Sequence, residues 1–196
     1  MTPPIRDAAS LLLLKQGGDG LRILMGMRHA GHKFMPNRMV FPGGAVDALD
    51  FSLAPQASLR PGLREKLLRN ATPPMCDALG MACARELLEE TGLSLGSPPD
   101  LSGLDYLCRA VTPEDHTIRF NARFFVADAA CASGTLAGSG ELESLDWYPL
   151  ATISQWQLAG ATRAVLDQLQ IWLTLSEAER SRRSVPVLLN RGWQDD

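Results

Sequence analysis

The stretch Arg85–Leu93, RELLEETGL, packs three glutamates into five residues of an otherwise apolar sequence that favours a helix. At about 100° per residue, Glu86, Glu89 and Glu90 fall within roughly a third of the circumference of a helix. Like charges three and four residues apart repel one another by a few tenths of a kcal/mol per pair. Two explanations are open. Either the helix presents a solvated acidic face, or its carboxylates together bind a divalent cation.

Composition alone favours the solvated face, because most glutamates on helices are simply exposed to water. The context of the stretch favours the cation. An FPGG turn at residues 41–44 precedes it, and Ala82 and Cys83, one turn earlier on the same face, leave room for a close approach. Arg85 lies four residues before Glu89 and can hold its carboxylate in place. Carboxylate clusters suit hard cations, so we expect Mg²⁺ or Mn²⁺ and not zinc, which prefers histidine and cysteine.

Upstream of this helix the sequence predicts strands. Apolar runs over residues 8–14 and 21–29 flank a glycine-rich turn and are typical of buried, paired strands. The run RMVFPGGAVD, residues 38–47, predicts a short strand that stops at Pro42 and the two glycines after it. Residues 45–74 contain four prolines and one charged helical patch, so we expect an irregular segment there.

The helix itself is predicted from residue 75 to 91, with Gly92 as its left-handed cap. Three further strands and then a long amphipathic helix are expected at residues 104–112, 118–129, 142–150 and 153–175. Pro186 disfavours a helix in the remaining tail, where we expect an extended arm. Strands before, between and after two helices predict an α+β or layered α/β domain.

The bulk composition limits the classes of function. The 196 residues carry 19 basic and 22 acidic side chains, a net charge of −3, so the basic face expected of a protein that binds nucleic acid polymers is missing. The apolar run at residues 8–14 is too short to span a membrane, and no cleavable signal accompanies it. Four cysteines lack CxxC spacing, and we expect buried thiols of a cytoplasmic protein: Cys76, Cys83, Cys108 and Cys131.

Together with the FPGG turn, the stretch resembles the signature of the Nudix hydrolase family, Gx₅Ex₇REUxEExGU, in which U is a bulky aliphatic residue. Residues 85–93 match its second half at every defined position, and Gly44 matches the opening glycine. Gly44 and Arg85 lie 41 positions apart where the signature expects 14, so 27 residues are inserted. Counted back eight positions from Arg85, the isolated glutamate of the signature becomes Asp77.

The resemblance implies a fold. This is an α+β fold, an α/β/α sandwich, whose mixed central sheet carries the signature helix on one side and a long C-terminal helix on the other. We expect one domain over residues 1–196, with its core at about 6–155, the insertion at about 45–74, and the C-terminal helix and arm at 152–196. The insertion should project as a flap beside the site, because the entropy of closing a loop grows slowly with its length.

The resemblance also implies a chemistry, the hydrolysis of a nucleoside diphosphate linked to another group X by attack of water on phosphorus. The ligands of Mg²⁺ or Mn²⁺ would be Glu86, Glu89 and Glu90. Within the signature, Glu89 is the candidate for the catalytic base, with Arg85 beside it. In many relatives a glutamate from a later loop serves instead. Glu141 and Glu143 are placed for that role, or are ordinary loop acids.

The segment before the FPGG turn bears on the identity of X. It is either a solvated basic loop or a patch that faces phosphate, formed by Arg28, His29, His32, Lys33 and Arg38. We reject a zinc site, because no third soft ligand lies near the two histidines. The chain resembles the coenzyme A diphosphatase-like group of the family, the peroxisomal type, in three features. These are the sequence HKFMPN…VFPGG, the long insertion and the sequence RFNARFFVA at residues 119–127.

Coenzyme A or an acyl derivative is therefore the substrate that we favour, although Asn37 stands where the short coenzyme A motif has a glycine. NADH, ADP-ribose and oxidised nucleotides stay open, as does a catalytically silent module that binds a nucleotide. The partner is then a small molecule. A homodimer is also open, since the tail at residues 181–193 could reach a second copy.

Substrate-binding residues are expected on three segments. These residues are Arg28, Arg38, Phe41, Gly43, Gly44 and Phe125. Strand alternation separates Phe125 from its neighbours Phe120 and Phe124, which we expect in the core. Phe125 would then line a pocket for a base or an acyl chain.

Overall fold

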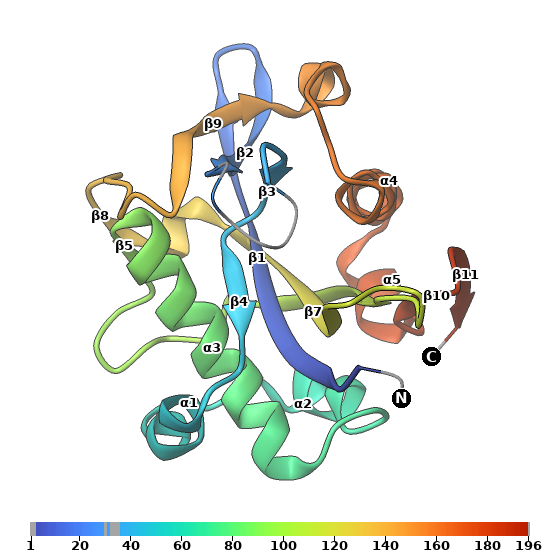
Figure 1. Cartoon of the computed structure of the whole chain (residues 1–196). Coiled ribbons are helices and arrows are strands. Elements are labelled where there is room, and N and C mark those ends of the chain that lie inside the picture. Colours follow the sequence, from blue (N-terminus) through green and yellow to red (C-terminus); the bar gives the residue numbers. More distant parts are fainter. Residues whose placement is uncertain (1–2, 30, 32–35, 196) are drawn as a thin grey trace.

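The structure is a computed structural model that describes residues 3–29, 31 and 36–195. Figure 1 shows strands gathered in the centre, with helices to either side. The strands are β1 (Ile5–Gly17), β2 (Gly20–Arg28), β3 (Met39–Val40), β4 (Gly43–Ala45), β5 (Leu93–Ser94), β6 (Asp105–Val111), β7 (Arg119–Asp128), β8 (Ser133–Gly134), β9 (Leu142–Pro149), β10 (Pro186–Leu189) and β11 (Gly192–Asp195). The helices are α1 (Ala48–Leu53), α2 (Pro61–Leu67), α3 (Pro73–Thr91), α4 (Gly160–Thr174) and α5 (Glu177–Arg182), with 3₁₀ turns η1 (Ala54–Gln56), η2 (Ala129–Cys131) and η3 (Leu150–Gln155).

Within the described residues, nine strands form one mixed sheet in the order β11-β10-β6-β7-β1-β2-β3, with β4 paired to β1 and β9 paired to β2. Strand β1 runs parallel to β7 along ten residue pairs. Its other edge is divided, because residues 8–10 pair with β4 and residues 14–17 pair with β2. The glycine strand β4 therefore lies beside the centre of the sheet.

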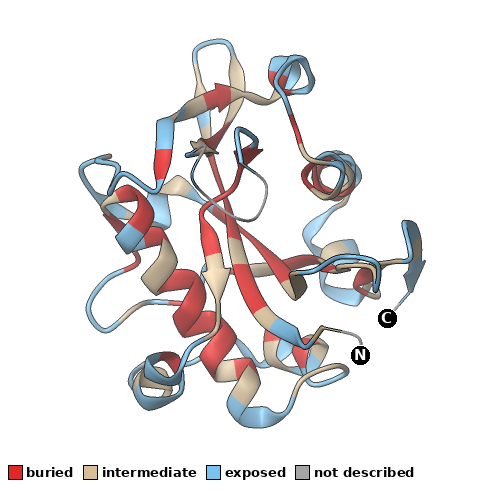
Figure 2. Ribbon diagram, viewed as in Figure 1, coloured by how far each residue is buried: buried red, intermediate tan, exposed pale blue. Residues whose placement is uncertain are grey.

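Strand β1 is apolar on both faces because helices cover both sides of the sheet. Leu11 and Leu13 belong to the core cluster under α3, whereas Leu12 and Leu14 belong to the cluster under α4. This alternation follows from the two-residue period of a strand. Figure 2 shows the buried residues concentrated along β1, α3 and α4. The predicted α+β sandwich, with one helix on each side of a mixed sheet, is confirmed.

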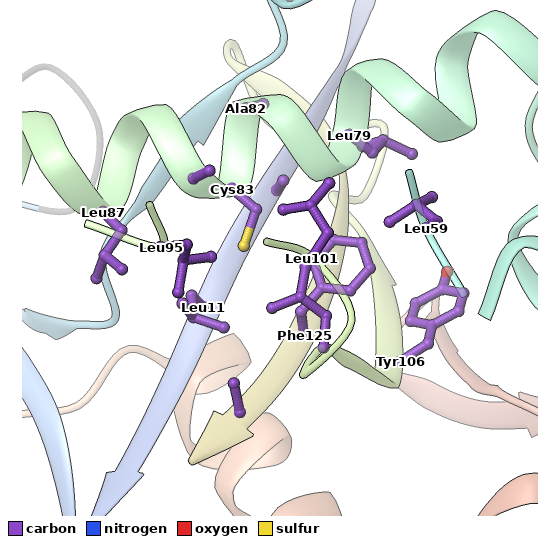
Figure 3. Packing of buried hydrophobic residues seen from close by; sticks show 14 of the residues in the cluster. Leu11, Leu59, Leu79, Ala82, Cys83, Leu87, Leu95, Leu101, Tyr106 and Phe125 are labelled. Carbon is purple, nitrogen blue, oxygen red and sulfur yellow. The ribbon is translucent and has the colours of Figure 1, made fainter. Parts of the chain in front are cut away.

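Helix α3 packs one face against the sheet and ends at Gly92. Leu79, Cys83 and Leu87 point down toward Leu11 and Phe125 (Figure 3). Gly92 has φ 72° and closes the helix as the predicted left-handed cap, with its N–H donating to the carbonyl of Leu88. Because this face is fixed by packing, the opposite face of the last two turns carries the glutamates.

Several boundaries differ from the sequence predictions. Gly43 and Gly44 do not end a strand but form β4, since they pair with Ser10 and Ala9 of β1. The insertion is more regular than expected and contains α1, η1 and α2. Helix α4 begins at Gly160, because the residues expected to open it form η3.

The tail and one cysteine also differ from expectation. The tail forms α5, β10 and β11, and β10 pairs with β6 of the same chain, so the arm extends its own sheet. Cys131 is exposed, whereas the other three cysteines are buried free thiols as expected. Among the described residues no helix is long and apolar enough to cross a membrane.

Candidate active site

Arg85 of α3 is the centre of a cluster of charged side chains. Its guanidinium forms a two-pronged pair with Asp50 of α1, with Nε 2.9 Å from Oδ1 and Nη2 3.0 Å from Oδ2. Its Nη1 donates to Glu86 Oε1 at 2.8 Å and to Glu89 Oε2 at 2.9 Å, and its Nη2 also donates to the carbonyl of Ala45 at 3.1 Å. One arginine therefore orients two glutamates and ties α1 and β4 to α3.

Asp50 is the buried partner in this cluster, with 1% of its side chain exposed against 14% for Arg85. A buried charge persists only when it is paired, and here both carboxylate oxygens are paired. The hydrogen bonds that Arg85 donates to Asp50, aided by the charge of Glu86, raise the pKa of Arg85, which stays protonated. A reciprocal capping box between Asp47 and Asp50 begins α1 and holds Asp50 in place.

The two glycines of β4 let the strand approach the helix closely. Gly43 donates its N–H to Glu90 Oε2 at 2.8 Å. A Cβ atom on Gly44 would lie 2.2 Å from Glu86 Oε1, and one on Gly43 would lie 2.3 Å from Ser10 Oγ. Any side chain at either position would therefore displace the carboxylates or the strand.

The glutamates differ in their environment. Glu90 is buried, and burial raises its pKa to about 8, although the hydrogen bond from Gly43 opposes the shift. Burial also raises the pKa of Glu86, an effect that the charge of Arg85 opposes and that Glu89 and Glu141 increase. Glu89 is exposed, with 55% of its side chain accessible. Two desolvated carboxylates thus lie beside an accessible one, with a single arginine among them.

Divalent cations fit this arrangement. Burial raises the pKa of Glu86 and of Glu90, and a bound cation would favour the charged form of both carboxylates. No three His, Cys, Asp or Glu side chains in the described part of the chain converge into a ready-made metal cage. Mg²⁺ does not require one, because it binds through one or two carboxylates together with water and substrate phosphates. Glu86, Glu89 and Glu90 are the residues that would hold such ions.

The later loop lies within electrostatic reach of the same helix. The exposed Glu141 raises the pKa of both Glu86 and Glu90, and its backbone carbonyl accepts the N–H of His29 at 3.5 Å. Glu143, on β9, instead faces His29 Nε2 at 3.5 Å. Of the two loop acids, Glu141 therefore acts on the glutamates of α3.

The fold of the chain and part of its sequence are similar to those of known proteins. A NUDIX hydrolase from Alicyclobacillus acidocaldarius superposes with a TM-score of 0.71 and 25% identity, covering 94% of this chain and 99% of that one. A MutT NUDIX hydrolase from Burkholderia pseudomallei superposes with a TM-score of 0.56 and 23% identity, covering 85% of this chain and 99% of that one. The curated "Putative nudix hydrolase 7" of Caenorhabditis elegans is 36% identical over 93 residues. Fold and sequence together support the Nudix hydrolase family.

The curated match is partial. It spans 47% of this chain and 23% of the Caenorhabditis elegans protein, and no family model matches the chain. The NUDIX domain of Shewanella oneidensis NrtR, solved in complex with ADP ribose, shares the fold with a TM-score of 0.53 at 17% identity. Nudix hydrolases, the proteins to which this chain is similar, act on pyrophosphate bonds.

Of the two acids that could correspond to the isolated glutamate of the signature, Asp50 lies against Arg85, whereas Asp77, the residue that we predicted, does not. Asp77 pairs with Arg64 at 2.9 Å, and it is Asp50 that reaches Arg85. Counted forward, Gx₅E from Gly44 leads to position 50. The 27 inserted residues therefore lie between Asp50 and Arg85, after the first half of the signature. The forward count was available in the sequence and would have identified Asp50.

The predicted substrate-binding residues separate into two groups. Arg28, Phe41, Gly43 and Gly44 line one cavity of about 550 Å³ on the α4 side of β4. Arg38 is exposed and does not line it, and His32 and Lys33 lie outside the described residues.

The assignment of Phe125 to substrate binding is wrong. Phe125 is completely buried under α3, against Tyr106. Phe120 and Phe124, which we expected only in the core, line the cavity instead. The alternation along β7 was correct, but the residues that face open space are those on the side of α4.

Proposed function

We propose that the chain is a divalent-metal-dependent hydrolase that cleaves a diphosphate bond in a nucleoside diphosphate derivative. The observation that carries the proposal is the close approach of Gly44 to Glu86, in a cluster whose arginine also holds Asp50 and Glu89. A solvated acidic face does not require a glycine against it or a buried counter-charge. This arrangement instead supports a site in which carboxylates are held at fixed positions.

Each side chain then has a distinct task. Bound Mg²⁺ or Mn²⁺ would neutralise the diphosphate and lower the pKa of bound water. Arg85 holds one oxygen each of Glu86 and Glu89, so neither carboxylate has to be ordered when substrate binds. Glu89 is the accessible member and takes the proton of the attacking water at Oε1, the oxygen that Arg85 does not hold. Glu141 is the second candidate for that base.

For the substrate we propose coenzyme A or an acyl derivative. Support comes from the resemblance of the segment before the FPGG turn and from Arg28, which lines the cavity beside the glycine strand and can meet a phosphate. NADH, ADP-ribose and oxidised nucleotides are the alternatives. ADP-ribose gains weight because it occupies the NUDIX domain of Shewanella oneidensis NrtR.

A panel assay tests the proposal. The purified chain is incubated with Mg²⁺ or Mn²⁺ and coenzyme A, acyl-coenzyme A, NADH, ADP-ribose or 8-oxo-dGTP, and mononucleotide products are measured. We expect turnover of at least one member, lost in Glu89→Gln and kept in Glu65→Gln, which changes an exposed glutamate of α2. Cleavage of coenzyme A would yield 3′,5′-ADP and a phosphopantetheine.

A catalytically silent nucleotide-binding module is the second candidate. The interrupted signature and Asp77, an aspartate in place of its isolated glutamate, favoured this reading of the sequence. Asp50 is also an aspartate, but its carboxylate pairs with Arg85, so a charged partner for that arginine is present. Saturable binding across the panel, with no turnover in either metal, would establish the silent module and refute the hydrolase.

Location and assembly complete the proposal. We place the chain in the cytoplasm, with a small molecule as its substrate and no nucleic acid polymer as a partner. A homodimer stays a prediction that light scattering can test. The tail no longer supports it, since β10 pairs with the chain's own β6.

A further inference from the structure

The cavity on the α4 side exists because three neighbouring strands carry alanine at the same level. Ala8 of β1 pairs with Ala122 of β7, and Ala122 pairs with Ala110 of β6. All three line the cavity, whose volume of about 550 Å³ lies within the range of small-molecule sites. The first turn of α4 forms the opposite wall with small residues. The hollow is therefore encoded by strands that are distant in the sequence.

The walls of this cavity are chiefly apolar. Phe41 and Phe124 meet edge to face with ring centroids 6.2 Å apart, and Val40 lies beside them. Thr162 of α4 also lines the cavity and brings a side-chain hydroxyl to this wall, although only 6% of the residue is exposed. A hydroxyl both donates and accepts hydrogen bonds, so Thr162 can meet one polar group that enters the cavity.

The cavity and the carboxylates are separated only by the backbone of β4. Gly43 and Gly44 line the cavity, yet Gly43 also donates to Glu90 and Gly44 comes close to Glu86. Arg28 lines the same cavity, and its charge lowers the pKa of Glu90. A group attached to a diphosphate at the glutamates can therefore enter the cavity by passing over the two glycines.

We propose that this cavity binds an aliphatic chain of the substrate and that Ala122 sets the length of chain accepted. The proposal rests on the proposed function, because the chain is the group linked to the diphosphate. The alanine row offers hydrocarbon contacts and no partner for the polar edge of a nucleobase, although Ser10, Thr112 and His116 also line the cavity. A chain needs only hydrocarbon contacts and one polar group, such as an amide or thioester, near Thr162.

The test uses ADP alkyl esters with two, six and ten carbons. Their KM values are measured in the wild-type chain, and their Kd values by calorimetry in Glu89→Gln, so that binding is read separately from turnover. We expect Kd and KM to fall roughly two- to fourfold for each methylene that enters the cavity. In Ala122→Leu this gain should stop at a shorter chain, with the two-carbon ester unaffected.

Two further variants and a second set of esters serve as controls for this test. Ala161→Leu fills the opposite wall if Ala122→Leu fails to fold, and Ala151→Leu is the exposed control. A Kd that does not depend on chain length would overturn the proposal. The proposal would also be overturned by a cavity that binds the base. In that case Kd would change when CDP esters replace ADP esters, and Ala122→Leu would raise Kd equally for esters of every length. Length-dependent binding without turnover would instead retain the cavity proposal and refute the hydrolase.

Discussion

The two sides of the glycine strand β4 differ in almost every physical respect. On the α3 side, Arg85 and four carboxylates are held within hydrogen-bonding distance of one another or of the strand, and two of the acids have raised pKa values. On the α4 side, alanines and phenylalanines surround an apolar hollow. The two glycines touch both regions, so a substrate can span them without a long path.

From this difference we infer that the groups that carry out the reaction and the groups that select the substrate lie on opposite sides of β4. Charges fixed by hydrogen bonds determine whether a phosphorus centre can be attacked. On the proposed function, the apolar hollow would stabilise the bound substrate and its transition state to a similar degree, so it should affect KM more than kcat. Changes on the α3 side should therefore alter kcat or stability, whereas changes on the α4 side should alter KM alone.

The largest expected effect is on stability, in Asp50→Asn. Asparagine removes the buried charge that accepts two of the hydrogen bonds of Arg85 and leaves the arginine with Glu86 and Glu89, and we expect a loss of about 3 kcal/mol in the free energy of unfolding. Asp77→Asn is the matched control. It breaks a pair with Arg64 that is partly exposed, so we expect a loss below about 1 kcal/mol. Urea unfolding measures both, and equal losses would contradict the assignment of Asp50.

The next effect is on catalysis, in Gly44→Ala. The added methyl group would have to displace the Glu86 carboxylate, whose oxygen lies 2.2 Å from its position. A shift of about 1 Å at a reacting site can cost roughly a hundredfold in rate, and we expect a loss of that order in kcat. Gly62→Ala is the control, since its Cβ meets no atom within 4 Å. Unchanged kcat in Gly44→Ala would separate Glu86 from the chemistry.

The sequence predicted the parts of this site that local signals determine. The α3 helix, its left-handed Gly92 and the pairing of Arg85 with Glu89 all depend on residues within one or two turns. Asp50 was missed because an insertion can fall on either side of an isolated acid, and counting from Arg85 alone cannot decide which. Only the folded chain brings Asp50, 35 positions away, against the arginine.

The faces of the strands were predicted less completely than the strands. Alternation correctly separated Phe125 from Phe120 and Phe124, since it depends only on the period of the chain. It could not tell which face would lie under tightly packed residues and which beside open space. The open space on one face exists where alanines of three separate strands lie side by side in the sheet. The sequence of a single strand does not show which residues will lie beside it.

The third effect concerns pH in the metal-free chain. The pKa of Glu90, about 8, lies above its unfolded value, so between roughly pH 4.5 and 8 the folded state binds more protons. The free energy of unfolding should therefore fall as pH rises through this window. Each kcal/mol lost lowers Tm by roughly 2–4 °C in a chain of this size. Glu90→Gln should lack the part of this fall that Glu90 causes and should keep the part that follows from the raised pKa of Glu86. Adding Mg²⁺ at pH 8 should restore Tm in the wild-type chain and release protons.

Calorimetry over that pH range, with and without chelator, checks this expectation. Parallel curves for the wild-type chain and Glu90→Gln would show that Glu90 does not carry the proton. A restoration of Tm by Mg²⁺ in Glu90→Gln equal to that in the wild-type chain would show that Glu90 contributes little to metal binding.

The smallest expected effect is on the α4 side, in Phe120→Ala. Phe120 is half-buried at the cavity wall, so its truncation should remove apolar contact with the substrate and raise KM about tenfold for the best substrate of the panel. kcat and the dependence on Mg²⁺ should stay unchanged, because no charged group of the α3 side moves. Phe51→Ala, at an exposed position of α1, is the control. A fall in kcat equal to the rise in KM would mean that the two sides of β4 are coupled, and that the substrate reaches the glutamates only when the cavity wall is intact.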